Sequence, residues 1–155
     1  MRRLIFTLVI PLTIISFAFF TKWWYALPED APDTMFIGFP FPYVGDGWGS
    51  SMSLQYFAIE FIADLLTYFA FWFLLAALID RFLIKIKLNK ALTIILWCFS
   101  GLIISGAVFI ASVFESNFYL TRDFKMEVLD SGFNLPLEHK QRPDLNKYHS
   151  ENKSR

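Results

Sequence analysis

The chain has little of what most enzymes and secreted domains require. Its single cysteine, Cys98, cannot form a disulfide within the chain, and no paired-cysteine metal motif is possible. A glycine-rich phosphate loop is absent, and the serines lack a base partner in the sequence pattern. The only histidines, His139 and His149, are ten residues apart in a polar segment, which is a poor spacing for a metal site. We therefore predict no catalytic residue, no metal site and no cofactor, and a protein that is not an enzyme.

What the chain has in abundance is apolar sequence, in three long runs. Hydrophobic residues make up 55% of the 155 positions, and phenylalanine alone occurs 19 times. The hydrocarbon core of a bilayer is about 30 Å thick, so a helix needs about 20 apolar residues to cross it. The runs reach or approach that length and predict transmembrane helices at about 4–21, 56–79 and 91–114. The predicted fold class is an all-α membrane protein.

The charged residues are divided between the segments that flank these runs, although the net charge is zero. Basic residues dominate before the first run and after the second, whereas the segment between these two runs is acidic. The basic residues are Arg2, Arg3, Arg81, Lys85, Lys87 and Lys90, and the acidic ones are Glu29, Asp30, Asp33 and Asp46. Lys and Arg near membrane ends are retained in the cytoplasm. The pattern predicts a cytoplasmic N-terminus, an external loop 22–55, a cytoplasmic connector 80–90 and an external C-terminus.

Two domains follow from this topology. Residues 1–115 form the predicted three-helix transmembrane domain, and 116–155 form an external tail. The tail has an alternating pattern at 124–128 that predicts a short strand turning back near Gly132. From about residue 141 it is polar and charged with little to bury, which predicts disorder.

The external loop is rich in proline and aromatic residues. The sequence Gly38-Phe39-Pro40-Phe41-Pro42-Tyr43 favours an extended, polyproline-like conformation. So many uncharged aromatic residues are expected to leave bulk water for the headgroup region. We assign a candidate interaction loop to Phe39, Phe41, Tyr43 and Trp48. The simpler alternative is an interfacial cap over the helix ends.

Glu60 and Asp64 are the only charged residues within an apolar run. Their spacing of four places both on one helix face, together with Thr67. Acidic residues in membrane spans usually face the bundle interior or water, and they mark functional sites by default. We therefore name Asp64 and Glu60 as candidate functional acids. The alternative is a structural pair that bonds to loop backbone or to other spans.

The third run has small residues at regular spacing. Gly101 and Ser105 fit the small-xxx-small form that lets membrane helices approach closely. Packing against the other two helices is one interpretation. Self-association, or contact with another membrane protein, is the other.

The sequence Gly38-Phe39-Pro40-Phe41-Pro42, followed by a span with Asp64-Leu65-Leu66, resembles a group of small three-span bacterial membrane proteins with a Gly-Phe-Pro-x-Pro external loop. The resemblance covers about 36–80 and implies no activity. It implies a bacterial inner-membrane location.

Together these observations predict a non-enzymatic multi-pass inner-membrane protein that acts through protein or lipid contacts at its external face. Its predicted partners are the lipid bilayer and other membrane proteins, and no nucleic acid. The alternative is a subunit of an ion- or proton-coupled transport system in which Asp64 titrates.

Overall fold

The structure is a computed structural model that describes residues 2–28, 34–47, 53–83, 85 and 89–134. Two predictions fall outside these residues: the role of Trp48 in the interaction loop, and the disorder from about residue 141. The connector between the second and third helices is described only in part.

Three long helical stretches are present, and each is long and apolar enough to cross a membrane by length and composition. The first and second each include a π-helical turn (η). In chain order the helical elements are α1 (Arg2–Leu4), η1 (Ile5–Val9), α2 (Ile10–Phe19), α3 (Ala58–Leu78), η2 (Ile79–Leu83) and α4 (Lys90–Val113). Asn89 is the N-cap of α4, because its side chain accepts a hydrogen bond from the backbone N–H of Ala91 at 3.4 Å.

The π turn in the first stretch leaves a backbone carbonyl without a partner in its own helix. The N–H of Ile10 bonds to the carbonyl of Ile5, and the next residue, Pro11, has no N–H to donate. The carbonyl of Phe6 therefore lacks its intrahelical donor. The indole of Trp97 on α4 supplies one at 3.0 Å. A polar backbone group freed by the proline is thus satisfied by a neighbouring helix.

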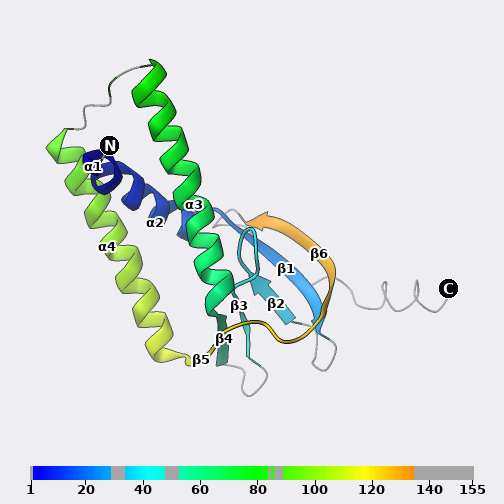
Figure 1. The fold of residues 1–155 in the computed structure, drawn as a ribbon. Helices are drawn as coiled ribbons and strands as arrows, with labels where there is room; N and C mark the ends of the chain where they lie inside the picture. Colours follow the sequence, from blue (N-terminus) through cyan, green and yellow to red (C-terminus); the bar gives the residue numbers. More distant parts are fainter. Residues whose placement is uncertain (1, 29–33, 48–52, 84, 86–88, 135–155) are drawn as a thin grey trace.

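In the described part of the chain, the segment between α2 and α3 and the segment after α4 together form one six-stranded sheet (Figure 1). Its spatial order is β5-β4-β3-β2-β1-β6, and every neighbouring pair is antiparallel except β4 and β5. The strands are β1 (Thr21–Pro28), β2 (Thr34–Ile37), β3 (Val44–Asp46), β4 (Ser53–Phe57), β5 (Glu115–Tyr119) and β6 (Met126–Asn134). Because α3 leads away from the sheet and α4 returns to it, the chain enters β5 parallel to β4.

The predicted all-α class is therefore wrong: the protein has a mixed α/β fold. The prediction of a multi-pass protein built of transmembrane helices alone is corrected with it. The sheet gives the chain an architecture typical of soluble α/β domains, and the helices qualify for a membrane only by length and composition. The predicted hairpin in the tail is also wrong. Residues 126–134 form a single strand, with a bulge opposite Tyr25 and Ala26, that pairs along the whole of β1.

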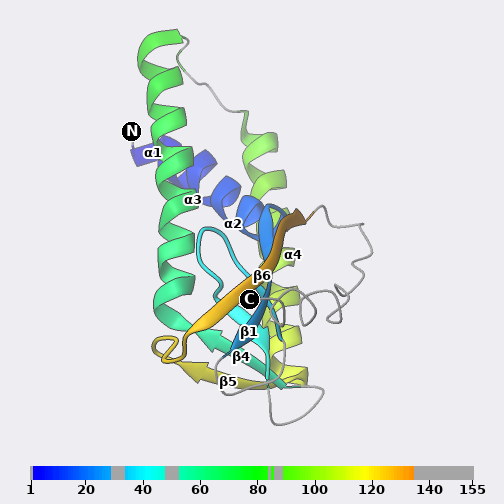
Figure 2. The ribbon, with the colours of Figure 1, turned by 90° about the vertical axis from the view of Figure 1, so that its right-hand side faces the viewer.

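The helices are not parallel to one another. In both views the α1–α2 stretch crosses α3 and α4 steeply, and α2 packs against both of them (Figures 1 and 2). Two further hydrogen bonds fix this crossing. The indole of Trp72 on α3 donates to the hydroxyl of Ser16 at 2.8 Å. The hydroxyl of the fully buried Ser100 on α4 is shared between the carbonyl of Leu96 in its own helix, at 2.8 Å, and the carbonyl of Pro11, at 3.3 Å.

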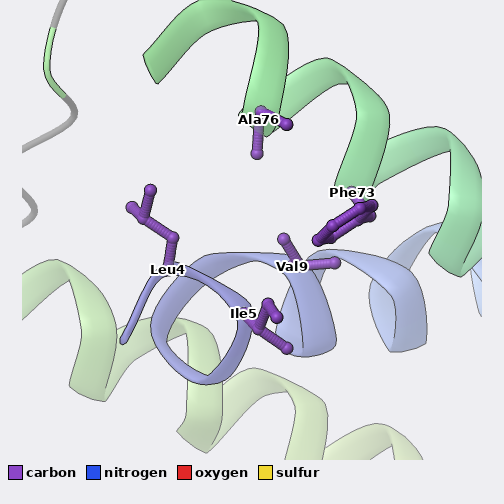
Figure 3. A pocket seen from close by; sticks show the side chains of 6 residues that line it. Leu4, Ile5, Val9, Phe73 and Ala76 are labelled. Atoms are coloured by element: carbon purple, nitrogen blue, oxygen red, sulfur yellow. The ribbon is translucent and has the colours of Figure 1, made fainter. Parts of the chain in front are cut away.

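The packing between η1 and α3 is not perfect. Apolar side chains from both elements leave a gap of about 10 Å³ between them (Figure 3). The labelled lining residues are Leu4, Ile5, Val9, Phe73 and Ala76. The gap has no polar lining and is about the size of one water molecule at most, so we assign it no ligand.

The sheet lies beside the first half of α3, and the second half of that helix extends beyond it (Figures 1 and 2). One face of the sheet is held by a small core of Ala26, Phe36 and Phe57, against which Phe124 and Met126 pack. Alternation along β4 places Ser53, Gln55 and Phe57 on the buried side, as the period of two in a strand requires.

Candidate functional site

The site is built around Asp64, which lies in the second turn of α3. Its side chain is fully buried, with 0% exposure, although it is a carboxylate in an apolar helix. Oδ1 accepts a hydrogen bond from the backbone N–H of Phe41 at 2.8 Å, and the backbone N–H of Phe39 also donates a hydrogen bond to the carboxylate. Oδ2 is buried and has no hydrogen-bond partner among the described residues. Asp64 thus joins α3 to the loop between β2 and β3.

That loop has a fixed shape. Gly38 adopts a φ of +155°, and a Cβ at this position would collide with the carbonyl of Phe41. The N–H of Gly38 donates to the carbonyl of Lys22 at 2.9 Å, and its own carbonyl accepts from the indole of Trp24 at 2.8 Å. The loop is therefore tied to β1 on one side and to Asp64 on the other. Gly38–Tyr43 is therefore a tight connection between β2 and β3, and not the extended, polyproline-like segment that its sequence predicts.

Aromatic rings surround the carboxylate. Phe17 stacks on Tyr43 with ring centroids 5.0 Å apart, and Phe61 contacts both rings at 5.1 and 5.4 Å. Tyr68 packs edge-on against Phe17 at 5.8 Å and against Phe39 at 6.3 Å. Edge-to-face and offset contacts at these separations are favourable. The rings come from α2, the loop and α3, and together they exclude water from Asp64.

Two tyrosines, Tyr43 and Tyr68, belong to this cluster. Burial raises the pKa of Tyr43 above its ordinary value, and the nearby charge of Asp64 raises the pKa further. Tyr43 consequently stays protonated throughout the physiological range. The hydroxyl of Tyr68 donates to the carbonyl of Phe20, which lies between α2 and β1.

Glu60, one turn before Asp64, joins α3 to a different part of the chain. Its Oε1 accepts a bond from the backbone N–H of Arg122 at 3.4 Å, and Oε2 is buried without a partner in the described part of the chain. The Arg122 side chain does not form an ion pair with it there. Its Nη1 donates to the sulfur of Met126 at 3.5 Å, and its Nε is buried and unpartnered among the described residues.

Chemically, this arrangement fastens segments together. Within the described residues no group of three or more His, Cys, Asp or Glu side chains could bind a metal ion. The side chains around Asp64 are aromatic, with no nucleophile paired to a base. The two acids instead attach one face of α3 to two segments of the sheet, the β2–β3 loop and the β5–β6 connection.

The structure brings together only some of the residues singled out in the sequence. Asp64, Tyr43 and the backbone of Phe39 and Phe41 meet, whereas the ring of Phe41 is 51% exposed. Thr67 is on the same helix face as Glu60 and Asp64, and its hydroxyl donates to the carbonyl of Ala63 in its own helix at 2.8 Å.

Two of the small residues of α4, Gly101 and Ser105, pack against no other helix among the described residues. Gly101 and Ser105 are exposed, and a Cβ at Gly101 would meet nothing within 4 Å. The buried small residue of this helix is Ser100, on a different face.

Sequence reasoning missed two residues of the site, Tyr68 and Arg122. Tyr68 could have been found, because it follows Asp64 by four residues and continues the stripe that begins at Glu60. Arg122 gives no such signal. Its contact with Glu60 joins residues 62 positions apart.

No protein-family model, curated protein or solved structure shows significant similarity to this chain. The function must therefore be inferred from the geometry.

Proposed function

We propose that this chain is a membrane-embedded interaction protein without catalytic activity. Its apolar helices lie in a lipid bilayer, and its sheet makes protein or lipid contacts at the outer surface. Asp64 and Glu60 have a structural role in this proposal: they fasten the sheet to the membrane helix α3.

The observation that carries this proposal is the exposed apolar surface of the helices. Only 11% of the most apolar stretch of α3 is buried within the chain, and only 6% of that of α4. Large side chains such as Leu102 and Phe109 are 70% and 68% exposed. Monomeric soluble proteins rarely expose continuous apolar patches larger than a few hundred Å². Lipid is the covering that fits two continuous helical surfaces of this length.

The sheet cannot lie in the hydrocarbon. Among the described residues no strand pairs with the outer edge of β5 or of β6, and the backbone N–H and C=O groups of open sheet edges are not tolerated in lipid tails. Headgroups and water can satisfy those groups. The rim of the sheet nevertheless exposes Phe118 by 74% and Leu120 by 73%, which suits the interfacial layer or a partner protein.

The charges support one orientation of this arrangement. Arg3 lies in α1 and Arg81 lies in η2, which follows α3, so both are at helix ends that are remote from the sheet (Figure 1). Placing these ends in the cytoplasm puts the sheet outside, and in a bacterium the membrane would be the inner one. The exposed Gly101 and Ser105 are then available for a second copy or another membrane protein.

A transport subunit is the second candidate, because the buried Oδ2 of Asp64 has no partner among the described residues. An uncompensated carboxylate oxygen in an apolar helix is a position for a proton or a cation. Three helices are few for a complete transporter, so this candidate requires an oligomer or a partner chain.

Site-specific photo-crosslinking in cells tests the leading proposal. A photoreactive residue at Phe118 on the sheet is compared with one at Phe82, which is similarly exposed (72%) but lies in η2 at the other end of α3. We expect a discrete protein or lipid-headgroup adduct at position 118 that is absent at position 82. Identical adducts at the two positions, or none at position 118, would contradict a role for the sheet surface.

A further inference from the structure

A cleft opens where β4, β5 and the β5–β6 connection meet. Its volume is about 160 Å³, enough for a small organic group. The described residues that line it are Gln55, Phe57, Tyr119, Thr121, Asp123 and Phe124.

The walls of the cleft are aromatic. Phe57 lies 6.2 Å from Tyr119 and 5.9 Å from Phe124, measured between ring centroids, and the Phe124 ring is turned 66° from it. Phe57 is 1% exposed and belongs to the core of the sheet, and its N–H donates to the carbonyl of Tyr43 at 2.8 Å. Tyr119 is 49% exposed and forms the open side. The rings are therefore held by the sheet before any ligand arrives.

The carboxylate of Asp123 also lines the cleft. Asp123 is exposed, and its Oδ1 accepts a hydrogen bond from the hydroxyl of Thr121 at 3.1 Å. The adjacent cation, Arg122, points its Nη1 at the sulfur of Met126, so Asp123 is the only charged lining group among the described residues. Gln55 is 5% exposed, and its amide nitrogen donates to the carbonyl of Asp46 at 2.8 Å.

We propose that this cleft binds a small organic ammonium group. Aromatic faces attract ammonium ions and accommodate their methyl or methylene groups, and a nearby carboxylate supplies the opposite charge. An anion is disfavoured because the charged lining group is itself negative. A bare metal ion is disfavoured because a single carboxylate among aromatic rings provides too few oxygen ligands.

The ammonium could belong to a lipid headgroup or to a free amine. Phe57 directly precedes α3, and the backbone N–H of Ile59 donates to the carbonyl of Leu120 at 3.1 Å, so the cleft lies close to the point at which α3 leaves the sheet. If the helices are embedded as proposed above, that point is at the level of the lipid headgroups. The lipid source thus rests on the proposed function, whereas binding of a free amine does not.

Calorimetric titration of the full-length chain tests the site. The protein is placed in nanodiscs of phosphatidylglycerol, which carries no amine, and titrated with choline and with ethanolamine. The uncharged carbon isostere of choline controls for simple apolar binding. Asp123→Asn and Tyr119→Leu are the test variants, and Asp46→Asn, an exposed aspartate that does not line the cleft, is the matched control. Circular dichroism verifies that each variant is folded.

We expect saturable amine binding that Asp123→Asn and Tyr119→Leu each weaken about fivefold or more, with Asp46→Asn unchanged. The isostere should bind more weakly than choline. Absence of saturable binding, equal binding of the isostere, or an unaltered affinity in folded Asp123→Asn would overturn the proposal.

A second set of nanodiscs identifies the source of the amine. In bilayers containing phosphatidylethanolamine or phosphatidylcholine, a headgroup in the cleft would compete, and the apparent affinity for free amine would fall. An unchanged affinity assigns the cleft to a free amine. A chain that binds amines but is not embedded in membranes would refute the proposed function and leave the amine site intact.

Discussion

The carboxylate of Asp64 attaches α3 to the β2–β3 loop, so replacing Asp64 should lower the free energy of unfolding. Asp64→Leu removes the acceptor of the Phe41 N–H, which donates at 2.8 Å. A hydrogen bond to a charged group contributes about 1.5–3 kcal/mol, and a donor left unsatisfied in a buried place loses a similar amount. We therefore expect Asp64→Leu to lower the free energy of unfolding by about 3 kcal/mol. Asp64→Asn keeps an amide oxygen as acceptor and should lower it by about 1 kcal/mol.

The assay is denaturant unfolding of the purified chain in detergent, followed by tryptophan fluorescence, to which Trp23 and Trp24 of β1 contribute. Hydrogen exchange at Phe41 reports on the loop directly, since its amide is protected only while the carboxylate accepts its bond. Glu127→Gln is the control, because it removes an exposed acid from β6. An Asp64→Leu protein with wild-type stability and a protected Phe41 amide would refute the reasoning. A stable Asp64→Asn protein that had lost an ion or proton flux would favour the transport subunit.

Three further predictions concern single contacts. Trp97→Phe deprives the Phe6 carbonyl of its donor and should weaken helix packing by about 1 kcal/mol, as measured by unfolding in mixed micelles. Gly38→Ala brings a Cβ against the Phe41 carbonyl and should destabilise the sheet by about 2 kcal/mol or more in the same measurement; a neutral effect would show that the loop can rearrange. Burial raises the pKa of Tyr43, so stability should be constant below the ordinary tyrosine pKa of about 10 and fall as the pH rises above it. Tyr43→Phe should move the alkaline unfolding midpoint to higher pH, and an unchanged midpoint would contradict this.

The helices could be predicted from the sequence because each one is a single continuous signal. A run of about 20 apolar residues predicts a membrane-length helix without information from elsewhere in the chain. The strands give no comparable signal. β3 has three residues and β2 has four, and both lie among prolines and glycines that favour loops. β1 pairs with β6, so that Trp23 lies opposite Gly132, more than a hundred residues away. Such pairing depends on the fold of the whole chain.

The candidate site could likewise be predicted only in part. The spacing of Glu60 and Asp64 placed both acids on one face of a helix, and Tyr68 continues that face. Bonding to loop backbone was one of the two interpretations of these acids, but the particular donors could not be predicted. They are the backbone N–H groups of Phe41 and Arg122, and every residue except proline carries such a group. Only the position of the loop determines which ones reach the acids.

The central claim, that the helices are embedded in lipid with the sheet outside, is tested most directly by cysteine accessibility in intact cells. In a Cys98→Ala background, Asn117→Cys places a thiol on β5 and Asn89→Cys places one at the start of α4, and both positions are exposed. We predict that a membrane-impermeant thiol reagent labels Cys at position 117 in intact cells but labels position 89 only after the membrane is opened. Labelling of position 89 alone, equal labelling of both positions, or recovery of the chain in the soluble fraction would contradict the account.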